Sequence, residues 1–254
     1  MTLVTRPVKG VLPGAGTVAS GGDRMLLTWD DGGVPLPDAR SELLAALVAW
    51  DDRAATRLLD RERERLGLDG FVGELVLPVM REIGLGWERG AVSVAQEHLA
   101  TQLVRSYLDR MTGGWGGGDG PQAWLACPPR ELHDLPLMAY GLLLRERGWR
   151  VRFFGASTPL HDLRRSVRVH RPEVVVVSGD DPVRLIAGRV ALDLLAGDTV
   201  LALGGRAAAL AGGDLPGTVL PPDLVVAADR LADLLVGGGP VGGGPVATEL
   251  VGTA

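Results

Sequence analysis

The chain has 254 residues, of which 46% are hydrophobic and 22% charged, and its formal net charge is −5. This composition is typical of a soluble globular protein with one large or two small domains. The sequence has no long basic run, which argues against direct nucleic acid binding, and no apolar stretch of the roughly 20 residues that a membrane span needs. The single cysteine, Cys127, cannot form an internal disulfide. We therefore expect a cytoplasmic protein without a membrane partner.

The first 37 residues are rich in glycine and proline and form a segment of their own in the predicted domain plan. Within this segment, the stretch from Thr17 to Trp29 favours a hairpin around Gly21–Gly22. The first 22 residues have no apolar core of the kind found in secretory leaders, so we expect no signal peptide.

The patterns between residues 38 and 112 predict a four-helix bundle with short loops. Asp38 can cap the first helix, and Asp51 or Asp52 the second, because a carboxylate accepts hydrogen bonds from the free N–H groups of a first turn. The positions expected to face inward on the first and fourth helices are Leu43, Leu44, Leu47, Val48 and Trp50, and then Val94, Ala95, His98, Leu99, Leu103 and Leu108.

The third helix is expected to run over Leu68–Ile83. Pro78 can kink this helix, because proline removes a backbone donor. Gly84 and Gly86 are expected to end it, since glycine readily takes the left-handed conformation that closes many helices. The fourth helix is then expected over Val92–Met111.

A glycine-rich segment, residues 113–121, is predicted to be a linker between two domains. Beyond it, strands and helices alternate over residues 122–236, which predicts an α/β domain with a doubly wound, parallel, Rossmann- or flavodoxin-like sheet. The tail, residues 237–254, repeats Gly-Gly-Gly-Pro-Val and is predicted to be disordered. The expected strands are 123–127, 151–154, 174–177 and 199–203, and the expected helices 137–147, 160–169, 182–195 and 224–236.

The loops that follow the predicted strands are the candidate site, because ligands of such sheets bind at the carboxyl ends of the strands. The first loop carries His133, with Glu131 two residues earlier. A carboxylate there can hold one ring nitrogen and leave the other free for a metal. Ser178 follows the third strand, and Gly204 and Gly205 follow the fourth, where small residues let a ligand approach the backbone. On spacing alone, a solvent-bonded loop histidine is the alternative.

These loops resemble the cobalamin-binding domain shared by methionine synthase, the corrinoid mutases and light-sensing cobalamin regulators. That family has an acidic-x-His-x-x-Gly loop after its first strand, a Ser-x-Leu after its third and a Gly-Gly after its fourth. The resemblance implies that His133 is the lower cobalt ligand and Glu131 its partner. It further implies that Ser178 contacts the nucleotide tail of the cofactor and that Gly204 and Gly205 form the tail channel.

Two positions depart from the family pattern. Pro136 stands where the family has glycine, and it stiffens the loop that the nucleotide tail must pass. Asp180 stands where the family has leucine, and it places a charge near a largely apolar slot. Both departures bear on the path of the tail and on which corrinoid binds.

The bundle carries a second pattern, in which Trp87 is followed ten residues later by Glu97 and then His98. This Trp-x9-Glu-His pattern resembles the cap of the CarH-type light-sensing transcriptional regulators, whose Trp lies over the adenosyl group with Glu and His beside it. The resemblance implies that adenosylcobalamin is held between the bundle and the α/β domain. Taken alone, Trp87 could equally be an anchor of the bundle core.

CarH-type regulators carry a winged-helix DNA-binding domain before the bundle, and residues 1–37 are too short for one. The resemblance therefore implies a light sensor, not an enzyme, that signals through a homo-oligomer or a regulatory protein partner. The similar photocobilin subgroup also binds a bilin. Because Cys127 is expected in a buried strand, a biliverdin would be noncovalent, and His161 and the first 37 residues are places where it could lie.

Two other classes of function stay open at this point. A corrinoid methyl-carrier protein of a methyltransferase system would use the same His133 loop, but its upper face must meet a substrate, and Trp87 would be in the way. An anti-repressor that uses cobalamin only as a structural or metabolic signal would bind its partner independently of light.

Overall fold

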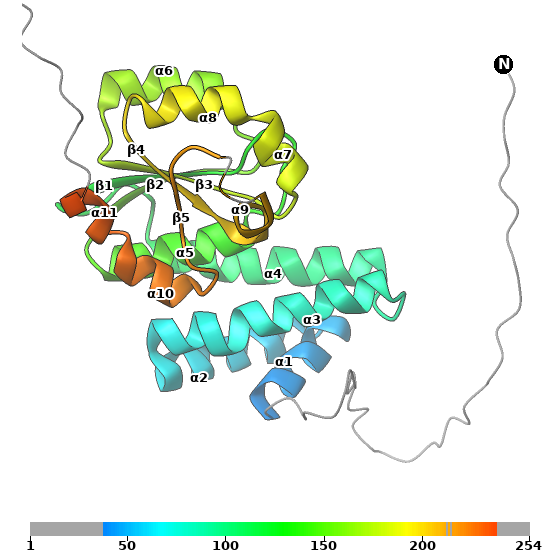
Figure 1. Ribbon diagram of the computed structural model, residues 1–254. Helices are drawn as coiled ribbons and strands as arrows, with labels where there is room; N and C mark the ends of the chain where they lie inside the picture. The colour runs from blue at the N-terminus through cyan, green and yellow to red at the C-terminus, as the bar shows by residue number, and fades with distance from the viewer. Residues whose placement is uncertain (1–37, 212, 214, 238–254) are drawn as a thin grey trace, which may run out of the picture.

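The computed structural model describes residues 38–211, 213 and 215–237, so the predicted hairpin around Gly21–Gly22 and the tail after residue 237 lie outside the described residues. A helical part is followed by a five-stranded sheet flanked by helices (Figure 1). The elements of the helical part are α1 (Asp38–Val48), α2 (Asp52–Gly70), the π-helical η1 (Phe71–Val76), α3 (Leu77–Glu88) and α4 (Val94–Thr112). The strands are β1 (Gln122–Ala126), β2 (Arg150–Gly155), β3 (Val174–Ser178), β4 (Val200–Gly204) and β5 (Thr218–Val219). The helices among them are α5 (Leu135–Glu146), α6 (Leu160–His170), α7 (Pro182–Ala187), α8 (Arg189–Ala196), α9 (Gly205–Ala211), α10 (Leu224–Arg230) and α11 (Asp233–Gly237).

Side-chain caps fix the starts of two helices in the helical part. Asp51 caps α2, as predicted, and its carboxylate accepts a hydrogen bond from the backbone N–H of Ala54 at 2.9 Å. At the start of α4, Ser93 and Gln96 bond each other's backbone N–H groups in a capping box. The Gln96 side chain also donates to the carbonyl of Val48 at 3.0 Å, which ties α4 to the end of α1.

The third predicted helix has the expected start but not the expected end. The backbone breaks at Gly67 (φ 67°, ψ 179°), and helical structure then continues through η1 and α3 as far as Glu88. Gly84 and Gly86 lie inside α3, because neither takes the positive φ of a helix-ending glycine. Pro78 lies in the first turn of α3.

The buried face of α4 differs from the predicted one. Val94, Ala95, His98 and Leu99 are exposed, and so is Trp50 beyond the end of α1, although the pattern places all five inward. The core face of α4 begins one turn later and consists of Ala100, Val104, Tyr107 and Leu108. The first turn and a half of α4 is therefore not part of the bundle core.

The sheet confirms the predicted doubly wound α/β fold. Its strand order is β2-β1-β3-β4-β5, and every paired strand is parallel to its neighbour. The apolar run of β3 is buried between two other strands, as a continuous β-branched stretch predicts. Three details differ from the prediction: the helix expected over 182–195 is interrupted at Gly188, the closing helix is divided into α10 and α11, and α9 and β5 were not predicted.

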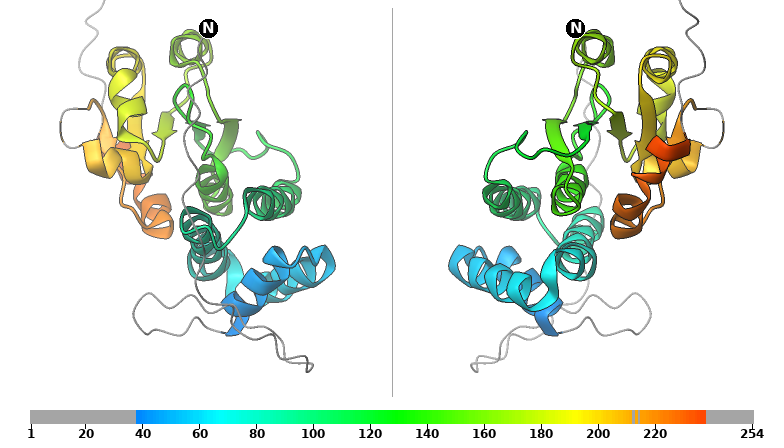
Figure 2. Two further views of the ribbon diagram at one scale, coloured as in Figure 1. Left: turned by 90° about the vertical axis from the view of Figure 1, so that its right-hand side faces the viewer. Right: turned by 90° about the vertical axis from the view of Figure 1, so that its left-hand side faces the viewer.

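Different layers cover the two faces of the sheet. Along β1, Ala123 and Leu125 belong to a core shared with α5, α10 and the N-terminal helices, whereas Trp124 and Ala126 belong to a second core under α6 and α8. Figure 2 shows α5 and α10 on one side of the sheet, with α4 beside α5 and the other N-terminal helices farther from the sheet. The helical part and the α/β part are therefore joined by one continuous hydrophobic core. No helix in the described ranges is long and apolar enough to cross a membrane.

The predicted linker, residues 113–121, is packed against the α/β part. The Trp115 ring stacks on Phe153 with 5.1 Å between ring centroids. Trp115 also lies so close to Gly141 of α5 that an added Cβ there would be 2.9 Å from its ring. Arg145 contacts the face of the same ring and donates a hydrogen bond to the carbonyl of Gly114.

Candidate functional site

The candidate site lies at the carboxyl edge of the sheet, between β1 and β3. The chain leaves these neighbouring strands toward β2 on one side and β4 on the other, so their loops diverge and leave room for a ligand. The two loops are nevertheless connected, because the backbone N–H of Asp180 donates to Glu131 Oε2 at 3.0 Å.

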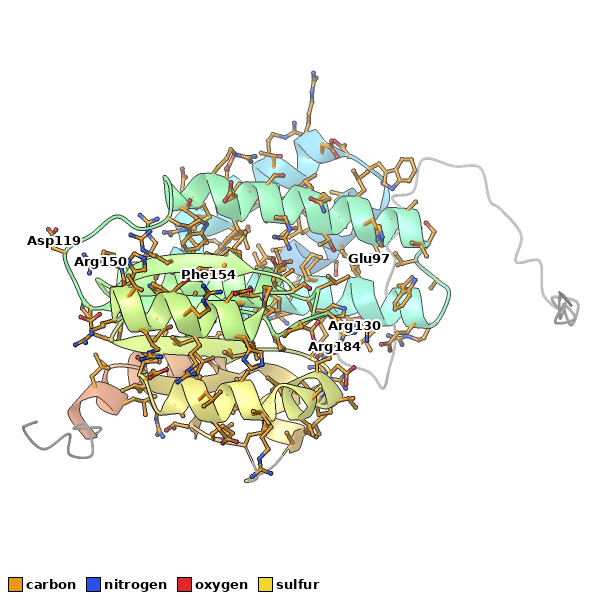
Figure 3. All side chains as sticks on the ribbon, turned by 90° about the horizontal axis from the view of Figure 1, so that it is seen from above. Glu97, Asp119, Arg130, Arg150, Phe154 and Arg184 are labelled. Carbon is orange, nitrogen blue, oxygen red and sulfur yellow. The ribbon has the colours of Figure 1, made fainter. Side chains whose placement is uncertain are left out.

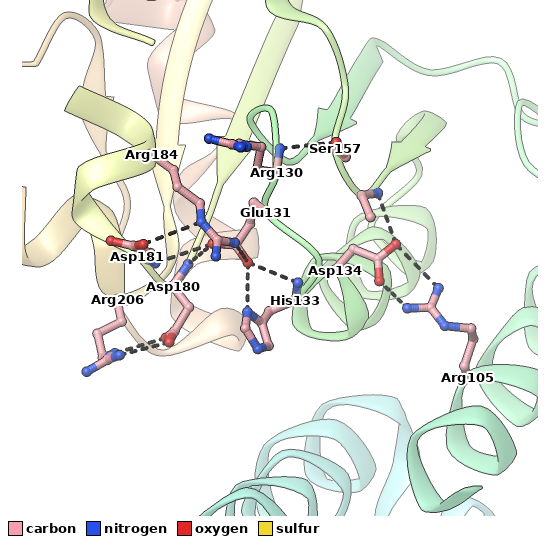
Figure 4. A network of polar contacts seen from close by, with 11 residues as sticks. Arg105, Arg130, Glu131, His133, Asp134, Ser157, Asp180, Asp181, Arg184 and Arg206 are labelled. Atoms are coloured by element: carbon pink, nitrogen blue, oxygen red, sulfur yellow. Dashed lines mark hydrogen bonds and ion pairs between the residues drawn. The ribbon is translucent and has the colours of Figure 1, made fainter. Parts of the chain in front are cut away.

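Glu131 and His133 form the hydrogen bond that their spacing predicts. His133 Nδ1 lies 2.7 Å from Glu131 Oε1, and the backbone N–H of His133 donates to the same oxygen at 3.0 Å. The Glu131 side chain is fully buried, whereas 69% of the His133 side chain is exposed. Figure 4 shows the His133 ring pointing from its loop toward the N-terminal helices. The ring is thus held at one nitrogen and open at the other.

Glu131 is the acceptor on which the loops of this edge converge. Its Oε2 also accepts from the backbone N–H of Asp181 at 3.3 Å, and Arg184 of α7 donates to its Oε1 at 3.1 Å. Burial by itself would raise the pKa of the Glu131 carboxyl, but hydrogen bonds from the backbone and from His133 lower that pKa to about 2. An ionised Glu131 can only accept, so in the neutral His133 ring the proton lies on Nδ1 and Nε2 has a free lone pair.

Asp180, one of the two departures from the cobalamin-binding pattern, forms an ion pair with Arg206. Both of its carboxylate oxygens accept from Arg206, at 2.9 and 2.8 Å, and this pair holds the pKa of Asp180 below its usual range. The Arg206 side chain is largely exposed, and that of Asp180 is about half exposed. The charge of Asp180 therefore lies in a surface ion pair.

A narrow slot of about 40 Å³ opens between β3, β4 and the helices α5 and α10. The structure brings Ser178, Gly204 and Gly205 together in the lining of this slot, and Asp180 is not among the lining residues. Gly205 has φ 78°, and an added Cβ would lie 2.3 Å from the carbonyl oxygen of Gly179, so only glycine fits there.

The other departure, Pro136, lines the same slot from the first turn of α5. Proline is compatible with this position, because a first-turn residue needs no backbone donor. A slot of this size holds no more than about three water molecules, since each needs roughly 10–15 Å³ of such space. A nucleotide tail therefore enters only if lining side chains such as Leu220 and Tyr140 move, and the Tyr140 hydroxyl is bonded to the carbonyl of Ala227 at 3.2 Å.

The predicted upper-face residues lie in the last turn of α3 and the first turn of α4. Trp87 is 49% exposed, and the His98 side chain is 73% exposed. Glu97 accepts a hydrogen bond from Thr101 at 3.0 Å and lies 2.5 Å from His98 Nδ1. Figure 3 shows Glu97 toward the same end of the molecule as Arg130 and Arg184. Among the described residues, no hydrogen bond or ion pair joins these three side chains to His133.

Sequence reasoning missed the arginines that hold the site together. Arg105 of α4 bonds Asp134, and Arg184 of α7 bonds Glu131. The members of these pairs are 29 and 53 residues apart in the chain, so no local spacing could reveal them.

The surroundings of Cys127 and His161 do not indicate a catalytic or metal-binding role. Cys127 is buried, and burial raises the pKa of its thiol to about 12, in agreement with an unreactive cysteine. His161 is exposed in the first turn of α6. Within the described part of the chain, no group of three or more His, Cys, Asp or Glu residues is placed to hold a metal ion.

A larger cleft of about 460 Å³ lies between α3 and the turn that leads into α10. Leu77, Leu85 and Pro222 supply apolar surface to it, and Arg40 and Arg81 supply positive charge. Arg40 uses its Nε to donate to the carbonyl of Glu74, and no hydrogen bond or ion pair of Arg81 occurs among the described residues. The remaining lining residues are Gly73, Pro78, Glu82, Asp223 and Leu224.

A family model described as "B12 binding domain" matches residues 39–111. The matched range covers the helical part from α1 to α4.

Two curated relatives from Myxococcus xanthus are similar to about half of the chain. The HTH-type transcriptional repressor CarH is 35% identical over 139 residues, which are 55% of this chain and 46% of CarH. The HTH-type transcriptional repressor CarA is 32% identical over 140 residues, which are 55% of this chain and 47% of CarA. The chain thus spans about half the length of the curated relatives that it matches.

The fold also resembles a solved structure, that of the monomethylamine corrinoid protein of Methanosarcina barkeri. The two structures superpose with a TM-score of 0.63 over 78% of this chain and 98% of that protein. Since the sequences are only 13% identical, this likeness establishes the common fold alone.

Proposed function

We propose that this protein binds adenosylcobalamin between its N-terminal helices and the carboxyl edge of its sheet, and that it is a cytoplasmic light sensor and not an enzyme. The observation that carries the proposal is the His133–Glu131 pair, an exposed imidazole held at Nδ1 by a buried carboxylate. A neutral imidazole with a free Nε2 is the kind of ligand that a cobalt corrinoid accepts from a protein. The matches to the B12 binding domain and to CarH and CarA support the same cofactor.

In this proposal the two parts of the chain hold opposite faces of the cofactor. His133 is the lower ligand, with Ser178, Gly204 and Gly205 beside the nucleotide tail. On the helical side, the half-exposed Trp87 covers the upper face and excludes water, and Glu97 accepts hydrogen bonds from the adenosyl group. When bound, adenosylcobalamin supplies a cobalt–carbon bond that visible light can break.

The proposed output is a change of assembly or of partner binding. The first turn and a half of α4 is exposed and carries Glu97, His98 and Leu99, so a ligand at the upper face contacts side chains that the bundle core does not fix. Loss of the adenosyl group would remove these contacts and free the start of α4 to rearrange. CarH and CarA are repressors by name, which supports a regulatory output.

The test is the absorption spectrum and the molar mass of protein loaded with adenosylcobalamin, before and after green illumination. We expect a light-dependent spectral change and a shift in molar mass, and we expect His133→Ala to lose the spectrum of a histidine-ligated cofactor. His170→Ala, which replaces an exposed histidine at the opposite end of α6, is the matched control and should behave as wild type. If illumination changes neither the absorption spectrum nor the molar mass of the holoprotein, the sensor function is ruled out.

A corrinoid methyl carrier is the second candidate, favoured by the fold shared with a corrinoid protein. Such a carrier must expose its upper face to a substrate, and Trp87 at the end of α3 argues against this role. Protein loaded with methylcobalamin should keep its methyl group when mixed with thiol or amine acceptors in the dark. Rapid dark transfer would favour the carrier instead.

A noncovalent bilin is a further proposed ligand, and the cleft beside α3 is its candidate site. Biliverdin carries two carboxylates on a flat apolar body, and the cleft offers Arg40 and Arg81 beside Leu77, Leu85 and Pro222. Far-red absorption of protein produced together with biliverdin would support this ligand, and Arg81→Gln should weaken its binding. An absence of far-red absorption would remove the bilin from the proposal.

A further inference from the structure

An ion pair between Arg105 and Asp134 joins the helical side of the site to the sheet side. Arg105 Nη2 bonds Asp134 Oδ1, and Nη1 lies 3.4 Å from Oδ2, so the guanidinium meets the carboxylate with two nitrogens. Asp134 is almost fully buried and Arg105 mostly so. Figure 4 shows Arg105 reaching from its helix to Asp134 in the loop that carries His133. A buried carboxylate of this kind depends on its counter-ion.

Arg105 lies on the same face of α4 as Glu97, one of the proposed upper-face residues. Glu97, Thr101 and Arg105 are spaced four residues apart, which aligns them along one side of the helix. At 1.5 Å per residue, Arg105 is roughly 12 Å along the axis from Glu97. The hydrogen bond from Thr101 to Glu97 continues this polar row. A tilt of α4 as one body would therefore move Glu97 and Arg105 together.

Asp134 follows His133 directly, and its side chain bonds the His133 loop to the loop after β2. Its Oδ2 accepts from the backbone N–H of Ala156 at 3.1 Å, and an added Cβ at Gly155 would lie 3.1 Å from the same oxygen. The carbonyl of Glu131 accepts from the backbone N–H of Ser157 at 2.8 Å. His133 is thus flanked by two residues that are both bonded to the loop after β2.

The other described ion pairs between the helical part and the α/β part are far from His133. Arg147 pairs with Asp69 at 3.0 Å, and Arg63 with Glu146 at 3.7 Å. Both pairs lie at the far end of α5, whose 12 residues extend about 18 Å. Arg105–Asp134 is the described ion pair that connects the helical part to the His133 loop itself.

We propose that Arg105 is a positioning residue that couples the two faces of the cofactor site through Asp134. The inference rests on the proposed cobalamin site. While α4 is in place, Arg105 holds Asp134 and keeps His133 at the position where its Nε2 can bind cobalt. When the upper face changes and α4 shifts, the ion pair carries that shift to the loop of the lower ligand. In this proposal, the Arg105–Asp134 ion pair links the position of α4 to the ability of His133 to bind cobalt.

The test compares Arg105→Met with Arg147→Met, which removes an ion pair between the same two parts of the chain away from the site. The proteins are loaded with cobalt(II) cobalamin, and electron paramagnetic resonance measures the fraction of cobalt bound to a histidine nitrogen, identified with ¹⁵N-histidine. We expect Arg105→Met to lower this fraction at least twofold and to weaken adenosylcobalamin binding about tenfold, the size of a typical coupling between neighbouring charged groups. Arg147→Met should leave both unchanged, and Arg105→Lys should restore most of the loss.

Hydrogen exchange of the apo-protein supplies a readout that does not depend on the cofactor. Residues 131–134 should exchange faster in Arg105→Met and as in wild type in Arg147→Met. If Arg105→Met fails to fold, the double variant Arg105→Met with Asp134→Leu removes the unpaired buried charge and should show the same loss of histidine ligation. Wild-type ligation in either variant, or an equal loss in Arg147→Met, would overturn the coupling. A wild-type protein without any histidine nitrogen on cobalt would instead overturn the proposed cobalamin site.

Discussion

The sheet edge and the helical cap of the proposed site are built in opposite ways. At the sheet edge, Glu131 is fully buried and accepts hydrogen bonds from its own loop, from the loop after β3 and from α7, and Gly205 fits against the backbone of the loop after β3. At the cap, the Trp87 and His98 side chains are exposed, and among the described residues neither makes a hydrogen bond beyond its own helix. In the proposed site, the chain thus organises the lower side by itself, and a bound ligand would complete the upper side. Changes at the sheet edge should therefore affect the apo-protein, and changes at the cap only the complex.

The largest expected effect is on the stability of the sheet edge. Gly205→Ala puts a Cβ 2.3 Å from a backbone oxygen at φ 78°, and the clash and the strained backbone together should cost about 4 kcal/mol of unfolding free energy. Gly84→Ala is the matched control in α3, where a Cβ meets nothing within 4 Å and should stabilise the helix by about 0.5 kcal/mol. Urea unfolding measures both. Equal effects would contradict the claim that the sheet edge is preorganised.

The next effect is a pH dependence that Glu131 gives to the apo-protein. Its pKa is lowered from 4.5 to about 2 in the folded state, so the ionised carboxylate stabilises the fold above pH 4.5. This contribution is lost as the pH falls from 4.5 toward 2, and it should amount to on the order of 3 kcal/mol. Urea unfolding of wild type and Glu131→Gln at pH 7, 4 and 3 isolates it. Parallel losses of stability in the two proteins would show that Glu131 is not the group that titrates.

His133→Ala should separate ligand binding from stability. Removing a metal ligand should weaken cobalamin binding on the order of 100-fold, at least as much as the loss of an outer-shell partner. Since the His133 side chain is 69% exposed, the unfolding free energy of the apo-protein should change by less than about 1 kcal/mol. Equilibrium titration with hydroxocobalamin and urea unfolding provide the two numbers. Unchanged affinity would remove His133 as the cobalt ligand.

Trp87→Ala should have the smallest effect, confined to the complex. The half-exposed ring should contribute less than about 0.5 kcal/mol to folding, as is usual for surface positions. It should contribute about tenfold to the affinity for adenosylcobalamin and nothing to that for hydroxocobalamin, which has no adenosyl group to cover. A large loss of apo stability would instead make Trp87 a core anchor.

The features predicted correctly from the sequence depend on local patterns. The buried apolar run of β3 and the hydrogen bond between Glu131 and His133 follow from the identity and spacing of neighbouring residues. The incorrect helix end at Gly84 has a physical reason, because a glycine ends a helix only if its φ is positive, and φ depends on the surrounding chain.

Two other features of the site could not be predicted from spacing. Val94 and Leu99 have the helical spacing of core residues, yet they lie on the part of α4 that the core does not reach. Long-range pairs such as Arg105–Asp134 and Arg184–Glu131 leave no local signal at all, because each depends on how distant elements pack. The sequence therefore predicts the local bond between His133 and Glu131, and it misses the distant arginines that bond to the same loop.

The stacking of Trp115 on Phe153 limits how the two parts of the chain can move. A free linker of nine glycine-rich residues would have a typical span of about 17 Å and would let the parts drift apart. With Trp115 anchored against Gly141 and Arg145, the flexible connection shortens to the turn at Gly113 and Gly114 that follows α4. Motion of the helices relative to the sheet should then be a small rotation about a fixed pivot, so that a local event at the upper face is converted into a directed tilt of α4.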